Sequence, residues 1–345
     1  MPLREEILEQ PAAAARLLSG QADAIEALAG AIRARGVRHV VIVARGSSDH
    51  AAIYAQYVLG IRHGLTVGLA TPSVVSVYGG DPVVSDALVI AISQSGASPD
   101  IIAVLEAARR QGALTVALTN DAASPLARAA DRTIDLSAGP ERSIAATKSY
   151  TTSLLAVAAL SAALTEDAAD RAVVAGVPAA LESALGLEPA MRDIAEAHAA
   201  ADRALLVARG YEYATVREWS IKVKELAHVF ADPYSAADFA HGPVALLEAG
   251  VPLIAIVRDG PTADGLVAQL TSLRADLDPD LTILSDRADA LALATRPVAL
   301  PSPPAEWVAP IATIVAGQFH AMYSTISRGR DPENPRSIVK VTRTR

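Results

Sequence analysis

The chain has 345 residues, of which 51% are hydrophobic and 4% aromatic, and it carries a formal net charge of −8. This length allows two domains with a core in each, and the composition is typical of a folded α/β protein. The acidic charge argues against a general affinity for nucleic acid or anionic lipid. The absence of cysteine excludes disulfides, thiolate metal sites and a cysteine nucleophile within these residues.

The chain shows no targeting or membrane signal. Its first residues, Met1–Ile7, are acidic and lack the apolar core of a signal peptide. The longest strongly apolar stretch, Leu154–Leu164, is too short to span a bilayer. We therefore expect a soluble cytoplasmic protein with no membrane partner.

The first half of the chain alternates apolar runs with helix-compatible segments. Strands are expected at Val40–Ala44, Thr66–Ala70, Ala87–Ser93, Leu114–Thr119 and Arg132–Leu136. Helices are expected at Asp49–Leu59, Ser98–Gln111 and Ala122–Ala130. This alternation predicts a doubly wound parallel sheet with helices on both faces, which is an α/β fold.

The second half repeats this pattern after an alanine-rich connection, Ser149–Leu185, that we expect to be helical and to end at Gly186. Strands are expected at Ala204–Ala208, Pro252–Val257 and Leu281–Leu284, and helices at Ala214–Phe230, Thr262–Ala275 and Ala305–Ser324. The tetrapeptide Val-Ala-Arg-Gly occurs at residues 43–46 and again at 207–210. Its recurrence about half a chain apart favours a duplicated domain.

A hydroxyl-rich turn follows the third expected strand. It reads Ser93-Gln94-Ser95-Gly96-Ala97-Ser98, with Pro99 next. Ser98 suits an N-cap and Pro99 the first helical position, and the free amides of such a helix end attract anions. A similar turn, Gly46-Ser47-Ser48, follows the first strand. An ordinary capped turn explains the pattern equally well, so both interpretations remain open.

The expected helix 214–230 carries charged residues beside its apolar stripe. The stripe consists of Val216, Trp219, Val223, Leu226 and Phe230, and Glu218, Lys222 and Glu225 line a neighbouring face. A carboxylate near an amine could move protons between carbon atoms, but a solvated salt-bridge ladder has the same spacing. His241 is followed by Gly-Pro, and by itself it fits a capping or core histidine as well as a catalyst. His228 is interpreted as a helix-surface residue.

Six ordered motifs resemble a known family. They are Glu5–Pro11, Ile92–Gly96, Ala145–Thr152, Lys222–Glu225, His241–Pro243 and Pro335–Lys340. Together they resemble a tandem of sugar isomerase (SIS) domains, such as the isomerase half of glucosamine-fructose-6-phosphate aminotransferases. The resemblance implies two SIS domains, at residues 28–165 and 190–327, after an N-terminal helical segment, 1–27, and before a tail, 328–345.

The resemblance also implies roles for individual residues. Those that would bind a hexose 6-phosphate are Ser47, Ser48, Ser93, Gln94, Ser95, Ser98, Ala146 and Lys224. Glu225 would move a proton between C1 and C2, with Lys222 nearby. His241 would open the sugar ring from the neighbouring subunit of a homodimer, and Lys340 would reach the sugar carbonyl. Such chemistry needs no metal or redox cofactor, because a carboxylate returns the proton and lysines stabilise the intermediate oxygen.

Departures from the aminotransferase pattern favour a different reaction. The chain shows no glutaminase segment, and its first turn has Arg45-Gly46-Ser47-Ser48 where the aminotransferases usually have Cys-Gly-Thr-Ser. Trp219-Ser220 replaces small residues, so Trp219 could line or narrow the space for the leaving amine. With the terminal Lys340–Thr344, these features are similar to SIS-type glucosamine-6-phosphate deaminases.

We therefore expect conversion of glucosamine 6-phosphate to fructose 6-phosphate and ammonia. Alternatives are a deglycase of fructosamine-type 6-phosphates and an aminotransferase-like isomerase without the glutaminase. A phosphosugar sensor is a remote alternative, because no basic DNA-binding segment precedes the first strand and Glu225 and His241 are both present.

Overall fold

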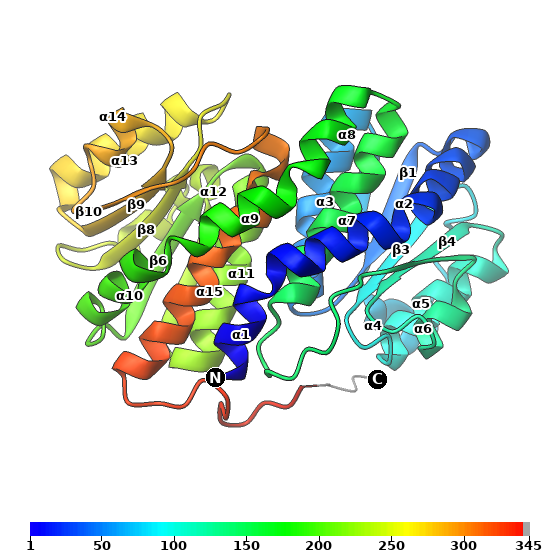
Figure 1. Ribbon diagram of the computed structural model, residues 1–345, viewed down its shortest axis with the longest axis horizontal. Coiled ribbons are helices and arrows are strands. Elements are labelled where there is room, and N and C mark those ends of the chain that lie inside the picture. The colour runs from blue at the N-terminus through cyan, green and yellow to red at the C-terminus, as the bar shows by residue number, and fades with distance from the viewer. Residues whose placement is uncertain (341–345) are drawn as a thin grey trace. The chain divides into compact units, whose positions relative to one another are not determined.

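The computed structural model describes residues 1–340 and divides the chain into two compact units, each built around one sheet (Figure 1). The first unit comprises Glu9–Arg142, Ala146–Pro178 and residues 339–340. The second comprises Met1–Leu8, Ser143–Ala145 and Ala179–Ile338. None of the helices within residues 1–340 has the combination of length and apolarity that crossing a membrane requires.

The first sheet contains five parallel strands in the order β2-β1-β3-β4-β5. They are β1 (His39–Val43), β2 (Thr66–Leu69), β3 (Leu88–Ser93), β4 (Leu114–Thr119) and β5 (Arg132–Asp135). Every residue of β3 and β4 is buried, as expected for continuous apolar runs covered on both faces. In the register, Val41 lies beside Val89 of the neighbouring strand.

Two groups of helices flank the first sheet (Figure 1). The group around α7 contains α2 (Gln10–Arg35), α3 (Ser47–His63), α7 (Lys148–Thr165) and α8 (Ala168–Ala175). The other contains α4 (Pro72–Ser76), α5 (Pro99–Arg110) and α6 (Pro125–Ala129). Helix α2 runs across residue 28, where the first SIS domain was expected to begin. Helix α9 (Val177–Leu185) starts in the first unit and ends in the second, directly before Gly186.

The second sheet repeats the topology of the first. Its parallel strands follow the order β10-β9-β8-β6-β7. They are β6 (Arg203–Ala208), β7 (Phe230–Ser235), β8 (Pro252–Val257), β9 (Asp280–Ser285) and β10 (Arg296–Ala299). Strands β1 and β6, which lead into the repeated tetrapeptide, hold equivalent positions. The expected fold class, two doubly wound α/β domains in tandem, is confirmed.

Helices also flank the second sheet on both faces (Figure 1). On one face α10 (Glu188–Ala197), α11 (Tyr213–Ala227) and α15 (Ala309–Ser327) pack together, with α1 (Pro2–Leu8) against α15. The other face packs on α12 (Ala236–Ala240), α13 (Ala263–Leu277) and α14 (Ala288–Leu291). Single 3₁₀ turns lie at η1 (Gly210–Glu212), η2 (Pro243–Leu246) and η3 (Glu306–Val308).

Two sequence-based expectations for the second unit were wrong. The helix expected to reach Phe230 ends at Ala227, because His228 adopts the left-handed conformation at φ 57°. Phe230 then begins β7 and is 81% exposed, so it does not belong to the apolar stripe. Strands β7 and β10 were not predicted. Each lies at a sheet edge and contains a proline after its first residue, Pro233 or Pro297. A central strand tolerates proline only at its first residue, so these prolines hide the strand pattern.

Candidate active site

Helix α11 holds a buried lysine between two carboxylates. The amine of Lys222 lies 2.8 Å from Glu225 Oε2 and 3.5 Å from Glu218 Oε1. The side chains of Glu218 and Lys222 are buried, whereas that of Glu225 is 27% exposed. A ladder of surface salt bridges would leave all three in water. Burial of two of them weakens that interpretation and leaves Glu225 as the carboxylate that a ligand can reach.

The rest of α11 is fixed by packing and hydrogen bonds. Trp219 is fully buried, and its Nε1 donates to Nδ1 of His320 at 3.0 Å. The indole lies so close to Gly317 of α15 that a Cβ there would come within 2.8 Å of the ring. Ser220 donates to the carbonyl of Ala231 in β7 at 2.7 Å. Trp219 therefore joins two helices in the core, and the expectation that it lines the space for a leaving amine finds no support.

Two residues near the charged triad, one on α11 and one directly after it, are placed differently from the triad. Lys224 is exposed, and its pKa is below the ordinary lysine value because desolvation lowers it more than the nearby charge of Asp232 raises it. Both ring nitrogens of His228 are buried and have no hydrogen-bond partner among residues 1–340. His228 is therefore not the simple helix-surface residue that was expected.

His241 lies on a separate element of the second unit. It follows α12 as the C-terminal cap residue, and Gly242 at φ 141° turns the chain into η2. The imidazole is exposed and makes no side-chain hydrogen bond with any residue that the structure describes. The ring is thus available to a ligand or to another subunit, and it is not a buried structural histidine.

In the first unit, the turn after β3 is built as a cradle of hydroxyls and amides. Ser93 Oγ accepts the Gly96 amide at 3.2 Å, and Ser95 Oγ accepts the Ala97 amide at 3.3 Å. Because each hydroxyl serves here as an acceptor, its hydrogen remains available to an anion. Ser98 is the N-cap of α5 without a capping side-chain bond, and Pro99 begins the helix. These positions agree with the sequence prediction.

The geometry of this turn requires glycine at one position. Gly96 has φ +58°, and a Cβ on it would collide with the side chain of Ser124. The turn is also fastened to the next loop, since Asn120 N donates to Gln94 O at 3.1 Å and Leu126 N to Gly96 O at 3.0 Å. Gln94 itself is half-buried.

The turn after β1 lies next to it at the point where the strand order reverses. Gly46, at φ 56°, leads into α3, which begins with Ser47 and Ser48. Open sheets of this topology bind ligands between the carboxyl ends of these two neighbouring strands, β1 and β3. Arg45 pairs with buried Asp100 of α5 at 2.9 Å and so links the two turns. Sequence reasoning missed this ion pair, which joins residues far apart in the chain.

The tail lysine also meets a partner within the first unit. Lys340 Nζ donates to Glu141 Oε2 at 2.9 Å. Glu141 was not singled out from the sequence, although it lies just before the matched motif 145–152 that includes half-buried Ala146. Residues 341–344 of the tail motif lie outside the described residues.

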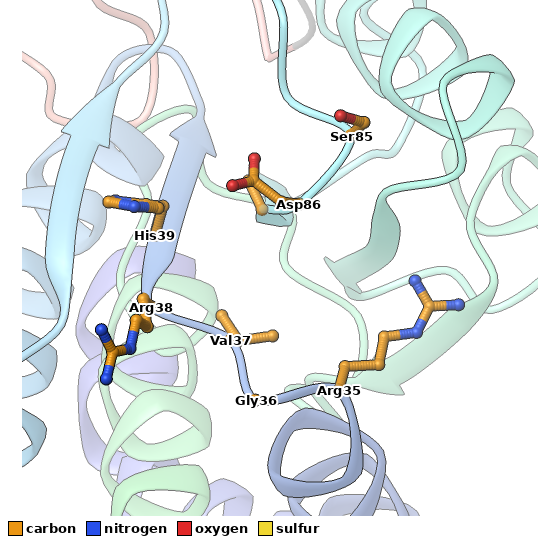
Figure 2. A pocket seen from close by; sticks show the side chains of 8 residues that line it. Arg35, Gly36, Val37, Arg38, His39, Ser85 and Asp86 are labelled. Carbon is orange, nitrogen blue, oxygen red and sulfur yellow. The ribbon is translucent and has the colours of Figure 1, made fainter.

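A pocket of about 270 Å³ in the first unit lies at the opposite edge of the sheet (Figure 2). It is lined by residues at the end of α2 and at the starts of β1 and β3, among them Arg35, His39 and Asp86. In Figure 2 the charged ends of Arg35 and Arg38 point in different directions. They therefore do not converge on one ligand, and the pocket is separate from the serine turns.

Sequence comparison places these features in a family. A model of the SIS domain matches residues 35–163 and again residues 199–322. The chain belongs to the SIS domain family. Among SIS-domain relatives, the glutamine–fructose-6-phosphate aminotransferase (isomerizing) of Thermococcus kodakarensis is 32% identical over 97% of this chain and 57% of its own length. That of Symbiobacterium thermophilum is 30% identical over 97% of this chain and 58% of its own length. The chain thus spans little more than half of these curated relatives.

Solved structures show the same fold. A protein from Silicibacter pomeroyi, provisionally named a phosphosugar isomerase, is 36% identical with a TM-score of 0.87, over 96% of this chain and 99% of that one. The glucosamine-6-phosphate deaminase of Thermotoga maritima has a TM-score of 0.79 at 18% identity, over the whole of both chains. At that identity the second likeness supports the fold alone.

Proposed function

We propose that this SIS-family protein is a phosphosugar aldose–ketose isomerase and deaminase. It would convert glucosamine 6-phosphate and water to fructose 6-phosphate and ammonia. The observation that carries the proposal is the α11 triad, in which a partly exposed carboxylate, Glu225, lies 2.8 Å from the amine of buried Lys222. Moving a proton between adjacent carbons needs one base that can return what it takes, and Glu225 fits that role.

In the proposed reaction, His241 protonates the ring oxygen, the C1–O5 bond breaks and the C1 hydroxyl loses its proton, which gives the open aldose. Glu225 takes the proton from C2 of the open aldose and returns it to C1, which leaves an imine at C2. Water adds to C2 and ammonia departs, giving the ketose. Lys222 is close enough to Glu225 to orient it and to stabilise the enolamine intermediate.

The phosphate would bind the serine turns of the first unit. Three kinds of donor support this proposal: the hydroxyls of Ser93 and Ser95, the free amides at the start of α5, and the hydroxyls of Ser47 and Ser48 after β1. Gln94, Ser98 and Ala146 are proposed as further sugar contacts, with Lys224 from α11. The homodimer that would supply His241 from a partner subunit is likewise a proposal, supported by the exposed imidazole.

A second candidate is an aminotransferase-like isomerase. It is favoured by the 32% identity to the Thermococcus enzyme over nearly the whole chain. This candidate would interconvert the aldose and ketose 6-phosphates without releasing ammonia.

A substrate panel distinguishes these reactions. Glucosamine 6-phosphate, fructose 6-phosphate, glucose 6-phosphate and fructosamine-type 6-phosphates are each incubated with the protein. Ammonia, free amine and ketose phosphate are measured together. Equal amounts of ammonia and fructose 6-phosphate from glucosamine 6-phosphate support the deaminase, and interconversion of the two hexose phosphates alone supports the isomerase. Release of a larger amine from the fructosamine compounds would instead establish a deglycase, and no turnover of any compound would refute all three.

A further inference from the structure

The carboxylate of Glu141 is a buried anion with several donors. Its side chain is fully buried, and Lys340 Nζ lies 2.9 Å from Oε2. Its Oε1 accepts the amides of Thr147 and Ser149, each at 3.0 Å, and its Oε2 accepts Ser149 Oγ at 2.8 Å. Both amides belong to the start of α7, so the helix end also favours the negative charge.

These contacts keep Glu141 ionised. Burial by itself raises the pKa of a carboxyl group, but the charge of Lys340 and the hydrogen bonds from Ser149, Lys340 and Thr147 together lower the pKa of Glu141 below its ordinary value. Several of these donors belong to the body of the first unit and do not depend on the tail. The site is therefore a preformed anion toward which a cation from the tail is attracted.

The position of Glu141 relates it to the proposed sugar site. It lies in the loop between β5 and α7, which leaves the carboxyl edge of the first sheet. Because all five strands are parallel, the serine turns after β1 and β3 leave the same edge. Hydrogen bonds of Asn120 with Ala138 N and Gly139 O, each 2.8 Å, join the loop after β4 to the loop that carries Glu141.

Residues 339 and 340, at the end of the described tail, differ in how they meet this loop. Val339 is 68% exposed, whereas the side chain of the next residue, Lys340, is only 24% exposed. The lysine side chain is turned toward the loop and that of its neighbour is not, which agrees with an ion pair that holds Lys340 at Glu141.

We propose that Glu141 is a positioning residue that docks Lys340 at the carboxyl edge of the first sheet. Its charge holds the amine there before the sugar arrives, and the sugar carbonyl then competes for the same amine. The effect of Glu141 on catalysis rests on the proposed function. The docking of Lys340 on Glu141 does not, because it requires no turnover of a sugar.

The lysines of this chain allow a direct test by acetylation. They are Lys148, Lys222, Lys224 and Lys340. The native protein and a Glu141→Gln variant are treated briefly with acetic anhydride, and modification at each lysine is followed by peptide mass spectrometry. Exposed Lys224 serves as the reference, and buried Lys148 and Lys222 report loss of structure. Lys148 begins α7 beside the Glu141 site, so it reports local damage as well.

In the variant, acetylation of Lys340 relative to Lys224 should rise about 10- to 100-fold, because the free energy of one hydrogen bond between charged groups changes an equilibrium by about this factor. Lys148 and Lys222 should stay protected. If the ratio of Lys340 to Lys224 acetylation is unchanged, the docking proposal is wrong. It is also wrong if acetylation of Lys148 rises as much as that of Lys340, because Glu141 then serves to hold the start of α7 together.

Turnover provides the second measurement. With a substrate from the panel, Glu141→Gln should lower kcat, and combining it with Lys340→Met should cost no more than Lys340→Met alone, since Glu141 acts through the lysine. A further loss in the double variant contradicts the positioning role. If the native protein turns over no sugar, the proposed function fails, while acetylation still decides whether Glu141 docks Lys340.

Discussion

The indole of Trp219 lies against the Cα of Gly317, so close that any side chain at position 317 would press into the ring. This contact sets the distance between α11, which carries the charged triad, and α15. The two helices are further joined by the hydrogen bond from Trp219 to His320. The proposed catalytic helix is therefore held by a buried contact that involves no catalytic group.

The Gly317→Ala variant should lose about 1–3 kcal/mol of unfolding free energy, because overpacking forces a rigid ring and two helices apart. Urea denaturation measures the loss. Gly30→Ala in α2 is the matched control, since a Cβ there meets no atom within 4 Å and should stabilise the protein by about 0.4–1 kcal/mol. Equal stability of the two variants would contradict the tight contact.

His320 should make stability depend on pH. Burial lowers the pKa of this imidazole to about 3, whereas in the unfolded chain it has an ordinary value near 6.5. Below about pH 6.5 His320 is protonated in the unfolded state but stays neutral in the folded state. The free energy of unfolding therefore falls as the pH is lowered, until the pH reaches the pKa of His320 in the folded state. The slope from this group approaches about 1.4 kcal/mol per pH unit.

A His320→Gln variant separates this slope from that of other groups, because glutamine can still accept the Trp219 hydrogen bond but does not titrate. Denaturation curves between pH 7 and pH 4 should show a shallower fall for the variant. Parallel curves for the two proteins would show that His320 does not titrate on unfolding.

Glu225→Gln should lower kcat by about 10²–10⁴-fold, the usual contribution of general acid–base catalysis, with little change in sugar binding. The amide retains the size of the side chain but cannot accept the C2 proton. Initial rates with glucosamine 6-phosphate test this prediction. Glu196→Gln, an exposed site on α10, controls for loss of one surface charge and should keep full activity. Near-normal turnover of the Glu225 variant would remove it from the mechanism.

Replacing Ser93 and Ser95 together with alanine should weaken binding of fructose 6-phosphate. Each lost hydrogen bond to the charged phosphate is worth about 1.5–3 kcal/mol, so the loss of two should lower the affinity at least about 100-fold. Calorimetric titration measures the change, and Ser183→Ala, at an exposed position of α9, is the control. If affinity is unchanged and the fold intact, the hydroxyls serve only to form the turn.

A shared site between subunits predicts complementation. A Glu225→Gln protein and a His241→Asn protein, each inactive, are mixed and allowed to exchange subunits. If His241 acts in the neighbouring subunit, about half of the dimers are mixed and each regains one intact site, so about a quarter of native activity returns. If both residues act within one chain, every site keeps a defect. Absence of recovery after proven exchange would therefore exclude the shared site.

Local features of the sequence determined much of the fold. Strands β4 and β8 have the predicted bounds, since a continuous apolar run between turn residues has few alternatives in an α/β protein whose sheets are covered by helices on both faces. The start of α5 was also predictable, because an N-cap serine followed by proline acts within one turn of helix. The edge strands β7 and β10 were hidden, since strand formation there depends on a neighbour and not on their own composition.

Only the tertiary structure decided which charged groups leave water. Spacing along α11 is the same for a solvated ladder and for a buried triad, and only the folded structure shows that Lys222 is buried and Glu225 partly exposed. The pairing of Lys340 with Glu141 joins residues 199 positions apart. Local spacing carries no information about such a contact, because the electrostatic attraction acts only after the fold has brought the tail to the buried carboxylate.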